Sequence, residues 1–358
     1  MEDWQPRRTI ILAYGFDEEC NGYRGAAHIA EVLEERWGKD GIALILDEGG
    51  MGLDTKGDTI YALPAVHEKS AVEMYIDLQI AGGHASKPPS HSGIGIMSEI
   101  VLALEAHPYQ PVLLAGSPYY KHLVCQACYS PEADPWLAGA LEKDRLDYVA
   151  ERIATQTPEI RFRIQTSQAV DLIQGGAKIN ALPESVSLGI DYRIAQHDSI
   201  ASIKANIIQY VEPIAEKYGL DFRAFDGDGE TAFNVKERER FAYNGTVHLK
   251  EGGSSPTSPI SPTEHSAIWD EFSATVQHVY SSYAKTVVPV GDFMNGNTDT
   301  RHYWNLTRNI YRWSPSRLGT RMNIHTVNER LDMSAHIDGF RLYYGEIPCN
   351  LIFVIGSY

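Results

Sequence analysis

The sequence predicts an α/β fold: a partly parallel sheet domain into which a smaller α+β two-layer domain is inserted. Residues 8–48 have the pattern strand, helix, strand, and both strands, TIILAY and IALIL, are continuous apolar runs. Such runs are typical of parallel strands that are buried on both faces. Residues 72–80 instead alternate strictly between apolar and polar side chains, as an antiparallel strand with one exposed face does. The change of pattern predicts the start of a second domain.

The middle of the chain continues the second pattern. Residues 185–193 alternate in the same way and predict another half-exposed strand. Apolar residues at helical spacing predict amphipathic helices over 94–104 and 199–218, and Gly219 suits the end of the second helix. Strands with one exposed face and amphipathic helices together predict a two-layer arrangement.

The last part of the chain returns to the first pattern. A segment rich in Gly, Ser and Pro, residues 251–265, predicts a linker back into the first domain. After it we expect a helix over 267–280, a buried strand TVVPV and a final helix over 328–343. The expected domain boundaries are therefore 1–69 and 251–358 for the two parts of the larger domain and 70–250 for the insertion.

Composition limits the classes of function. The chain has 358 residues, of which 43% are hydrophobic, and a net charge of −16, which disfavours binding to nucleic acid. Its four cysteines contain a single CxxC pair, so a four-cysteine zinc site is not supported. No apolar run is long enough to span a bilayer, and the N-terminus, MEDWQPRRTII, does not have the pattern of a signal peptide.

Acidic residues follow both buried strands near the N-terminus. Asp17, Glu18 and Glu19 follow the first strand, and Asp47 and Glu48 follow the second. A solvated loop whose acids cap a helix is one interpretation. The other is a divalent-metal site, because adjacent carboxylates repel unless a cation lies between them. The carboxyl ends of parallel strands are where ligands bind in such sheets, which favours the metal site.

The order of the segments resembles the zinc-dependent aminoacylase and carboxypeptidase family, and in particular its fungal carboxypeptidase S, or Gly-Xaa carboxypeptidase, branch. The segments that carry the resemblance are, in order, RRTIILAYGFDEE, LILDEGG, GGHASKPPSHSGIG, GGAKINALPESV, SPISPTEH, GNTDTRHYW and IHTVNER. The resemblance implies a catalytic α/β domain with an inserted lid domain that also serves dimerisation. It implies hydrolysis of an amide bond next to a free C-terminal carboxylate, with two zinc ions per active site and a Gly-Xaa dipeptide or an N-acyl amino acid as substrate.

The resemblance also assigns metal-binding and catalytic roles. Glu18 would be the general base that takes a proton from the attacking water, and Glu19 would be a zinc ligand. Either Glu48 or Asp47 would bind the other zinc; Glu48 is favoured, but Asp47 has the same chemistry. His325 would be the late histidine ligand. Histidine nitrogen and carboxylate oxygen are the ligands that such zinc sites use.

Three further residues take roles from the resemblance. His84 would stabilise the oxyanion in the active site of the partner subunit, although a turn histidine is the simpler interpretation. Arg301 would bind the substrate carboxylate, for which its planar guanidinium is suited, and the alternative is a surface ion pair. Asn180 would lie near the bound substrate, with a turn residue as the alternative.

Two segments of the family pattern have no match in this chain. Relatives carry an HxD segment with a zinc-binding histidine and a later bridging aspartate, and only eight residues precede TIIL here. The chain is therefore expected to begin part-way into the catalytic domain, to bind zinc weakly and to hydrolyse little. The alternative function is a non-catalytic truncated relative that keeps the dimerisation surface of the lid. A vacuolar or secretory location is expected if a signal or anchor precedes the chain, and a cytoplasmic one otherwise.

Overall fold

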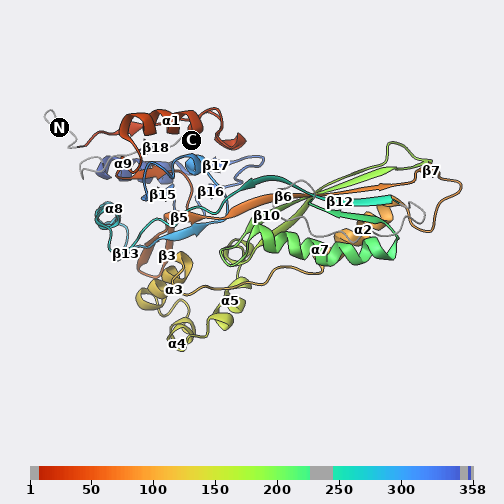
Figure 1. Ribbon diagram of the computed structural model, residues 1–358. Coiled ribbons are helices and arrows are strands. Elements are labelled where there is room, and N and C mark those ends of the chain that lie inside the picture. Colours follow the sequence, from red (N-terminus) through yellow and green to blue (C-terminus); the bar gives the residue numbers. More distant parts are fainter. Residues whose placement is uncertain (1–7, 226–244, 347–353, 356–358) are drawn as a thin grey trace. The chain divides into compact units, whose positions relative to one another are not determined.

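The computed structural model describes residues 8–225, 245–346 and 354–355. The chain divides into two compact units (Figure 1). Unit 1 comprises residues 1–68, 113–156 and 258–358, and unit 2 comprises residues 69–112 and 157–257. Residues 113–156 were expected in the inserted domain, but they pack with unit 1, because contacts between distant segments decide this membership and the local pattern does not.

Unit 1 is built around a mixed sheet in the order β1-β18-β2-β15-β5-β14. Its strands are β1 (Ile11–Leu12), β18 (Val354–Ile355), β2 (Ile45–Asp47), β15 (Ile310–Arg312), β5 (Ala65–Glu68) and β14 (Asp292–Met294). The neighbours pair in parallel, except that β15 and β5 are antiparallel. The partly parallel sheet predicted for the larger domain is confirmed.

Helices cover both faces of this sheet. One face packs against α1 (Ala26–Trp37), with Ile45 and Ile310 in the contact. The other packs against α8 (Ala267–Tyr280), with Leu46 and Tyr311 in the contact. The strands β2 and β15 are therefore buried on both faces, as the apolar run IALIL predicts for β2.

The same prediction is wrong for the first apolar run. The run TIILAY forms only the two residues of β1, and the Leu12 side chain is 57% exposed. In the described sheet β1 lies at an edge, where one side of the strand has no neighbouring strand to cover it.

The remaining elements of unit 1 surround this sheet. They are a three-stranded sheet of β13 (Thr286–Pro289), β4 (Thr59–Ala62) and β3 (Leu53–Lys56), helices α3 (Pro118–Tyr129), α4 (Leu137–Glu142) and α5 (Leu146–Ala154), the hairpin of β16 (Arg321–Met322) and β17 (Arg330–Leu331), and helix α9 (Met333–Glu346). The last helix begins later than the expected residue 328, because the hairpin occupies the residues before it.

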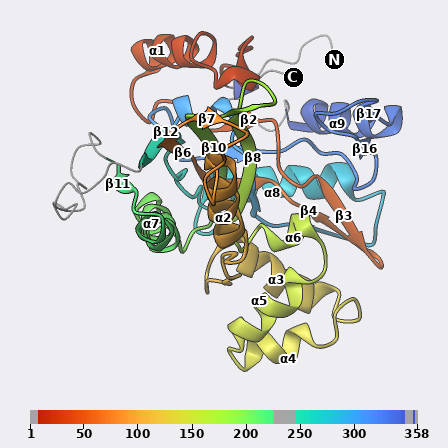
Figure 2. The same cartoon turned by 90° about the vertical axis from the view of Figure 1, so that its right-hand side faces the viewer.

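Unit 2 is a sheet with two helices on one face. Its strand order is β11-β12-β6-β10-β8. The elements are β11 (Asp221–Ala224), β12 (Gly245–Ser255), β6 (Ser70–Ile80), β10 (Ser185–Ile194), β8 (Ser167–Gly175), α2 (Gly93–Glu105), α7 (Ile200–Lys217), a short helix α6 (Pro158–Arg161) and the small pair β7 (Gly83–His84) and β9 (Ala181–Leu182). Figure 2 shows α2 and α7 side by side, and the ion pair between Glu99 and Lys217 joins them. The two-layer α+β arrangement is confirmed.

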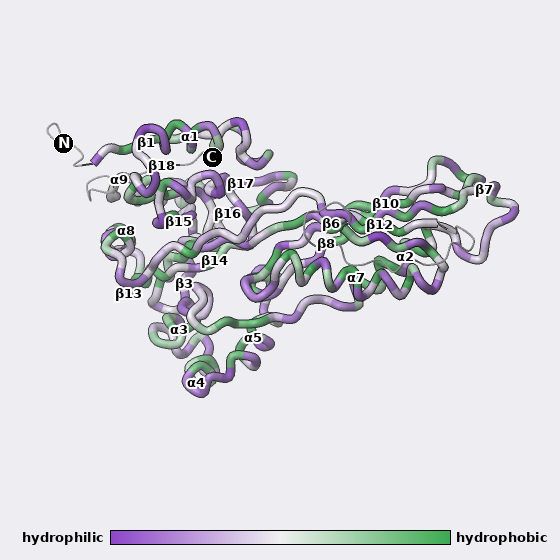
Figure 3. The backbone as a smooth tube through the Cα atoms, viewed as in Figure 1, coloured by the Kyte–Doolittle hydropathy of each residue, from purple (hydrophilic) through white to green (hydrophobic). Residues whose placement is uncertain are grey.

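The alternation in β6 and β10 positions the core of unit 2. Alternate apolar residues, such as Ile76 and Leu188, are fully buried in the cluster that α2 and α7 complete. The tube of α7 in Figure 3 accordingly carries both hydrophobic and hydrophilic segments. The helix begins with a capping box between Ser199 and Ser202. One expectation needs correction: residues 251–255 belong to β12, because their backbone continues its pairing with β6, so the linker is shorter than predicted.

No helix within the described ranges is long and apolar enough to cross a membrane.

Candidate metal and catalytic site

The loop after β1 separates the roles of its three acids. The Asp17 carboxylate accepts hydrogen bonds from the backbone N–H groups of Arg24 (2.7 Å) and Gly25 (2.8 Å), just before α1 begins. A Cβ atom at Gly25 would lie 2.6 Å from Asp17 Oδ1, so glycine is needed there. Asp17 therefore holds the loop in front of α1, although both N–H groups precede the helix and its N-cap residue, Gly25, makes no side-chain cap. This arrangement leaves Glu18 and Glu19, in the 3-10 helix η1 (Glu18–Cys20), for another role.

Four carboxylates from three separate segments lie near one another in unit 1. Glu18 comes from η1, Asp47 and Glu48 from the end of β2, and Asp299 from the 3-10 helix η2 (Asp299–His302). We call these four residues the acidic cluster. The strand β2 carries two of them at its carboxyl end, the edge at which parallel sheets place their ligands. The sequence prediction for Glu18, Asp47 and Glu48 thus coincides with a real gathering of charge.

Each acid of the cluster makes ionisation of its neighbours harder. Burial, and then the charges of Glu48, Asp299 and Glu19, raise the pKa of Glu18 to about 7. Burial and then the charge of Asp299 raise the pKa of Glu48. Burial and the charge of Asp299 also hold the pKa of Asp47 well above its usual range. Such mutual repulsion is relieved by protons or by a bound cation.

Asp47 is the most unusual member of the cluster. Its side chain is buried, with 2% exposure, and no other side chain hydrogen-bonds to its carboxylate oxygens; only the backbone N–H of the adjacent Glu48 acts on them. In β2 it follows Ile45 by two residues, so it points to the α1 face of the sheet. A buried carboxylate without a partner is costly. Its place in this site is therefore explained by a ligand better than by stability.

The predicted ligands Glu19 and His325 are neighbours on the protein surface. His325 Nδ1 lies 3.6 Å from Glu19 Oε2, and both side chains are largely exposed. His325 lies in the turn between β16 and β17, with a positive φ of 59°. Its charge also acts on the Glu48 carboxylate, whose pKa it lowers. A residue from the C-terminal part of the chain is thereby brought to the acids near the N-terminus.

Arg301 belongs to the same site. It lies in η2 two residues after Asp299, and its Nε donates a hydrogen bond of 3.2 Å to the carbonyl oxygen of Thr298. The Arg301 charge lowers the pKa of both Glu18 and Asp299. The guanidinium is half-buried, so it can meet a ligand while it balances part of the negative charge.

The predicted residues His84 and Asn180 lie together in unit 2. Ala85 donates its backbone N–H to the carbonyl oxygen of Asn180 (3.1 Å), and His84 pairs with Ala181 between β7 and β9. Both side chains are exposed. Asn180 has a φ of 73°, the geometry of a turn residue, and His84 Nδ1 lies 2.9 Å from Ser86 Oγ. Their roles in binding and catalysis remain predictions.

Sequence reasoning missed Asp299 and the buried pair Glu68–Arg312. Asp299 is 3% exposed, and the close approach of Gly22 places it beside the loop of Glu18: a Cβ atom at Gly22 would lie 2.8 Å from Asp299 Cβ. The signal was present in the segment GNTDTRHYW, where an acid lies two residues before the predicted Arg301. For Glu68 and Arg312 the sequence shows no comparable local signal.

The donors of the site suit a divalent cation in kind. They are carboxylate oxygens and one imidazole nitrogen, and the unpartnered oxygens of Asp47 would gain a partner. Over the described ranges, however, no three His, Cys, Asp or Glu side chains come close enough together to hold a metal ion by themselves. The residues present therefore match the chemistry of a metal site without completing its geometry.

A family model, Peptidase family M20/M25/M40, matches residues 1–347. The chain belongs to this peptidase family. It is 36% identical over 356 residues to carboxypeptidase S of Saccharomyces cerevisiae, covering 96% of the chain and 60% of the relative. It is 35% identical over 352 residues to an uncharacterized carboxypeptidase of Schizosaccharomyces pombe, covering 97% of the chain and 57% of the relative. The chain thus spans about three fifths of the length of these curated relatives.

More distant comparisons agree with this membership. An N-fatty-acyl-amino acid synthase/hydrolase of Homo sapiens is 26% identical over 343 residues, covering 92% of the chain and 59% of the relative. Human carnosine dipeptidase 1 has a similar fold, with a TM-score of 0.58 at 8% identity over 93% of this chain and 65% of that one. The M20 family metallo-carboxypeptidase Sso-CP2 of Sulfolobus solfataricus gives a TM-score of 0.54 at 12% identity, over 93% and 68% of the two chains. The expected family and fold are confirmed.

Proposed function

We propose that this chain carries catalytic and metal-binding side chains of a zinc-dependent peptidase that cleaves an amide bond next to a free C-terminal carboxylate. The acidic cluster is the observation that carries the proposal. It gathers four carboxylates from three segments, and one of them, Asp47, is buried with no side-chain hydrogen-bond partner. A bound cation offsets the charge of such a cluster. The peptidase family to which the chain belongs includes a metallo-carboxypeptidase, in which a metal ion takes part in catalysis.

Glu18 acts as the general base in this proposal. A carboxylate can act as a base when it lies within reach of the attacking water, and Glu18 lies among the acids proposed to hold the metal; in the metal-free chain, burial and these acids raise its pKa to about 7. Half-burial leaves it accessible to water. It would take a proton from the attacking water and return it to the amine that leaves when the amide C–N bond breaks.

Glu19, His325 and the acids after β2 would hold the metal. When bound, zinc would polarise the scissile carbonyl and favour ionisation of water. Of the two adjacent acids, we propose Asp47 as the ligand in place of Glu48, which the sequence favoured, because no other side chain hydrogen-bonds to the buried oxygens of Asp47. Two ions per site are proposed, as in the complete pattern of the resembling family.

Arg301 binds the free carboxylate of the substrate in this proposal. Its half-buried guanidinium lies beside the acidic cluster, so the substrate would have its carboxylate at Arg301 and its amide near Glu18. A Gly-Xaa dipeptide and an N-acyl amino acid both meet this requirement. His84 would supply the oxyanion donor, taken from the partner subunit of a homodimer formed through unit 2, and Asn180 would contact the substrate. The relatives named as a carboxypeptidase and an N-fatty-acyl-amino acid hydrolase support these two substrate classes.

Metal content decides between this proposal and a non-catalytic relative. The purified chain, incubated with zinc and desalted, is analysed for zinc per chain. Close to two ions, lowered by at least one in Asp47→Asn, would support the proposal, whereas the two unmatched family segments predict weaker binding. Asp77→Asn, on the exposed face of β6 in unit 2, is the control and should leave it unchanged. Zinc close to zero in the unsubstituted chain would support the non-catalytic alternative.

The role of Glu18 is tested on the zinc-loaded chain. Glu18→Gln should lower kcat by about 10²–10⁴-fold, because the substituted amide cannot take the proton, while zinc content stays unchanged. The measurement is hydrolysis of a Gly-Xaa dipeptide, with the corresponding dipeptide amide as the control substrate. Unchanged kcat in Glu18→Gln would remove Glu18 from the mechanism.

A further inference from the structure

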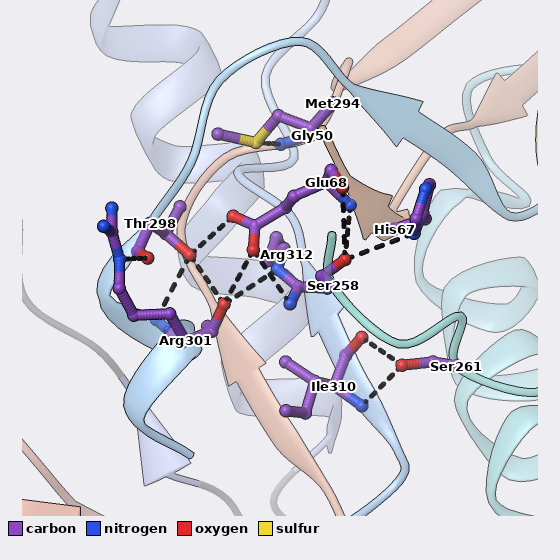
Figure 4. A network of polar contacts seen from close by, with 11 residues as sticks. Gly50, His67, Glu68, Ser258, Ser261, Met294, Thr298, Arg301, Ile310 and Arg312 are labelled. Atoms are coloured by element: carbon purple, nitrogen blue, oxygen red, sulfur yellow. Dashed lines mark hydrogen bonds and ion pairs between the residues drawn. The ribbon is translucent and has the colours of Figure 1, made fainter. Parts of the chain in front are cut away.

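A buried ion pair lies beneath the proposed site. Glu68, at the end of β5, and Arg312, at the end of β15, are each 1% exposed, and Arg312 Nη2 lies 3.0 Å from Glu68 Oε2. Two hydroxyls complete the carboxylate: Thr298 Oγ1 donates to Oε1 at 2.8 Å, and Thr300 Oγ1 donates to Oε2 at 3.1 Å (Figure 4). The Glu68 side chain therefore joins β5, β15 and the start of η2.

Thr298 and Thr300, whose hydroxyl groups donate to Glu68, are the sequence neighbours of Asp299 and Arg301. Asp299 lies between Thr298 and Thr300, and the Thr298 carbonyl oxygen accepts the hydrogen bond from Arg301 Nε (Figure 4). Arg312 Nε also donates to Thr300 Oγ1 at 2.9 Å. A shift of either threonine would displace the backbone that carries Asp299 and Arg301.

The same pair also reaches the other side of the site. Arg312 is the register partner of Asp47 in the parallel pairing of β15 with β2. Its charge lowers the pKa of Asp47, and its Nη1 has no hydrogen-bond partner in the structure. A single buried pair thus lies in contact with the strand end and with the turn that together supply the site.

Stability alone does not explain this pair. Removing two charges from water is expensive, and well-packed apolar residues in place of a buried pair are often equally or more stable. The neighbouring positions of β2 and β15 are filled by apolar residues. The charges lie instead where directional bonds fix a short turn, and directional bonds specify geometry better than apolar contacts do.

We propose that Glu68 is a positioning residue of the active site, which orients Arg301 through Thr298 and Thr300 for the substrate carboxylate. The role of Arg301 in binding a substrate carboxylate rests on the proposed function. The positioning of Arg301 by Glu68 rests on the contacts described above. Glu68 touches no reacting atom. Its effect passes through the hydroxyl groups of Thr298 and Thr300 to the 3-10 turn.

The test follows the Arg301 Nε–H group itself by nuclear magnetic resonance in the full chain labelled with ¹⁵N-arginine. The signal is assigned with Arg301→Lys. Glu68→Gln removes the charge at nearly constant shape, and Thr300→Val removes one hydroxyl while the ion pair stays. The matched control is Glu251→Gln, which breaks the Lys204–Glu251 ion pair (2.7 Å) in unit 2. Hydrolysis of a Gly-Xaa dipeptide is measured in parallel on zinc-loaded protein.

A positioning role predicts that Glu68→Gln and Thr300→Val both shift the Arg301 Nε–H signal and speed its exchange with water about tenfold, while Glu251→Gln does neither. In hydrolysis, both variants should raise KM about tenfold with a smaller change of kcat, because they weaken binding of the carboxylate. If Glu68→Gln does not fold, Thr300→Val carries the test.

An unchanged Arg301 signal in Thr300→Val, or in a folded Glu68→Gln, would overturn the proposal and leave the pair a purely structural one. The signal is recorded without substrate or metal. Absence of hydrolysis in the unsubstituted chain would therefore count against the proposed function, and the positioning result would be judged separately.

Discussion

The two units treat buried charge differently. In unit 2, Lys69 donates to the Gln165 carbonyl oxygen at 2.6 Å, and Lys204 pairs with Glu251 at 2.7 Å. In unit 1, the buried Asp47 has no side-chain hydrogen-bond partner and lies among other acids. These two lysines of unit 2 thus have polar partners, as buried charges generally do, whereas Asp47 in unit 1 departs from this rule.

The place of the exception is informative. Unpaired charge destabilises a fold, so a protein retains it where function requires it. The acidic cluster lies at the carboxyl end of β2, whereas the polar side chains of β6 and β10 in unit 2 lie on an exposed face. The comparison supports the proposal that unit 1 holds the metal and the general base, and the sheet of unit 2 buries one face against its helices.

The largest effect on stability is expected in the core of unit 2. Leu188 is fully buried between the sheet and its helices, so Leu188→Ala should lower the free energy of unfolding of this unit by about 2–5 kcal/mol. This loss of stability is measured by hydrogen exchange on peptides of unit 2. Leu172→Ala, on the same sheet but 41% exposed, is the control and should cost far less. Equal effects would mean that the sheet does not separate a buried from an exposed face.

The opposite sign is expected in the acidic cluster. Asp47→Ala removes a buried carboxyl that has no side-chain hydrogen-bond partner, so the metal-free chain should gain about 1–3 kcal/mol in unfolding free energy. The tryptophans of the described ranges all belong to unit 1, so their fluorescence during denaturation follows this unit. A loss of stability would show that Asp47 is satisfied in solution, and the contrast between the units would disappear.

The pH dependence of unit 1 sharpens the comparison. The pKa of Glu18 rises from 4.5 to about 7 on folding, so the folded state binds the proton more tightly. This contribution stabilises the fold at low pH and is lost as pH rises from about 4.5 to about 7. Burial lowers the pKa of His67 to about 4, which acts in the opposite direction, because stability is lost as pH falls below 6.5.

The contribution of Glu18 to this pH dependence is obtained by comparing the unsubstituted chain with Glu18→Gln. The free energy of unfolding of the metal-free protein, followed by tryptophan fluorescence, should fall more steeply with rising pH in the unsubstituted chain than in Glu18→Gln. Saturating zinc should reduce the difference, because a cation offsets the repulsion. Parallel pH profiles for the two proteins would show that Glu18 titrates as an ordinary exposed acid.

The smallest effect concerns a helix end in unit 2. The Ser199 side chain accepts a hydrogen bond from the Ser202 backbone N–H at 3.1 Å, so Ser199→Ala should cost about 1 kcal/mol. Faster hydrogen exchange confined to the first turn of α7 is the expected result. Ser98→Ala, in the middle of α2, removes only a bond to the Ile94 carbonyl oxygen and serves as the control. Equal exchange in both variants would contradict the capping role.

Local pattern determined the elements and part of the site. The alternation of residues 72–80 predicted β6, and helical spacing predicted α7 and α8, because neighbours in sequence decide which face of an element is apolar. The acids after the first two strands were found for a similar reason, since the ends of apolar runs are visible in the sequence.

Tertiary structure alone decided the rest. It placed residues 113–156 in unit 1 and made Asp17 hold the loop in front of α1. It also brought Asp299 to Glu18 and joined Glu68 to Arg312 across more than two hundred residues. No periodicity records such meetings, because they depend on how distant strands pair and pack. The partner of a buried charge such as Glu68 is determined by the whole fold, and the neighbouring residues in the sequence do not predict it.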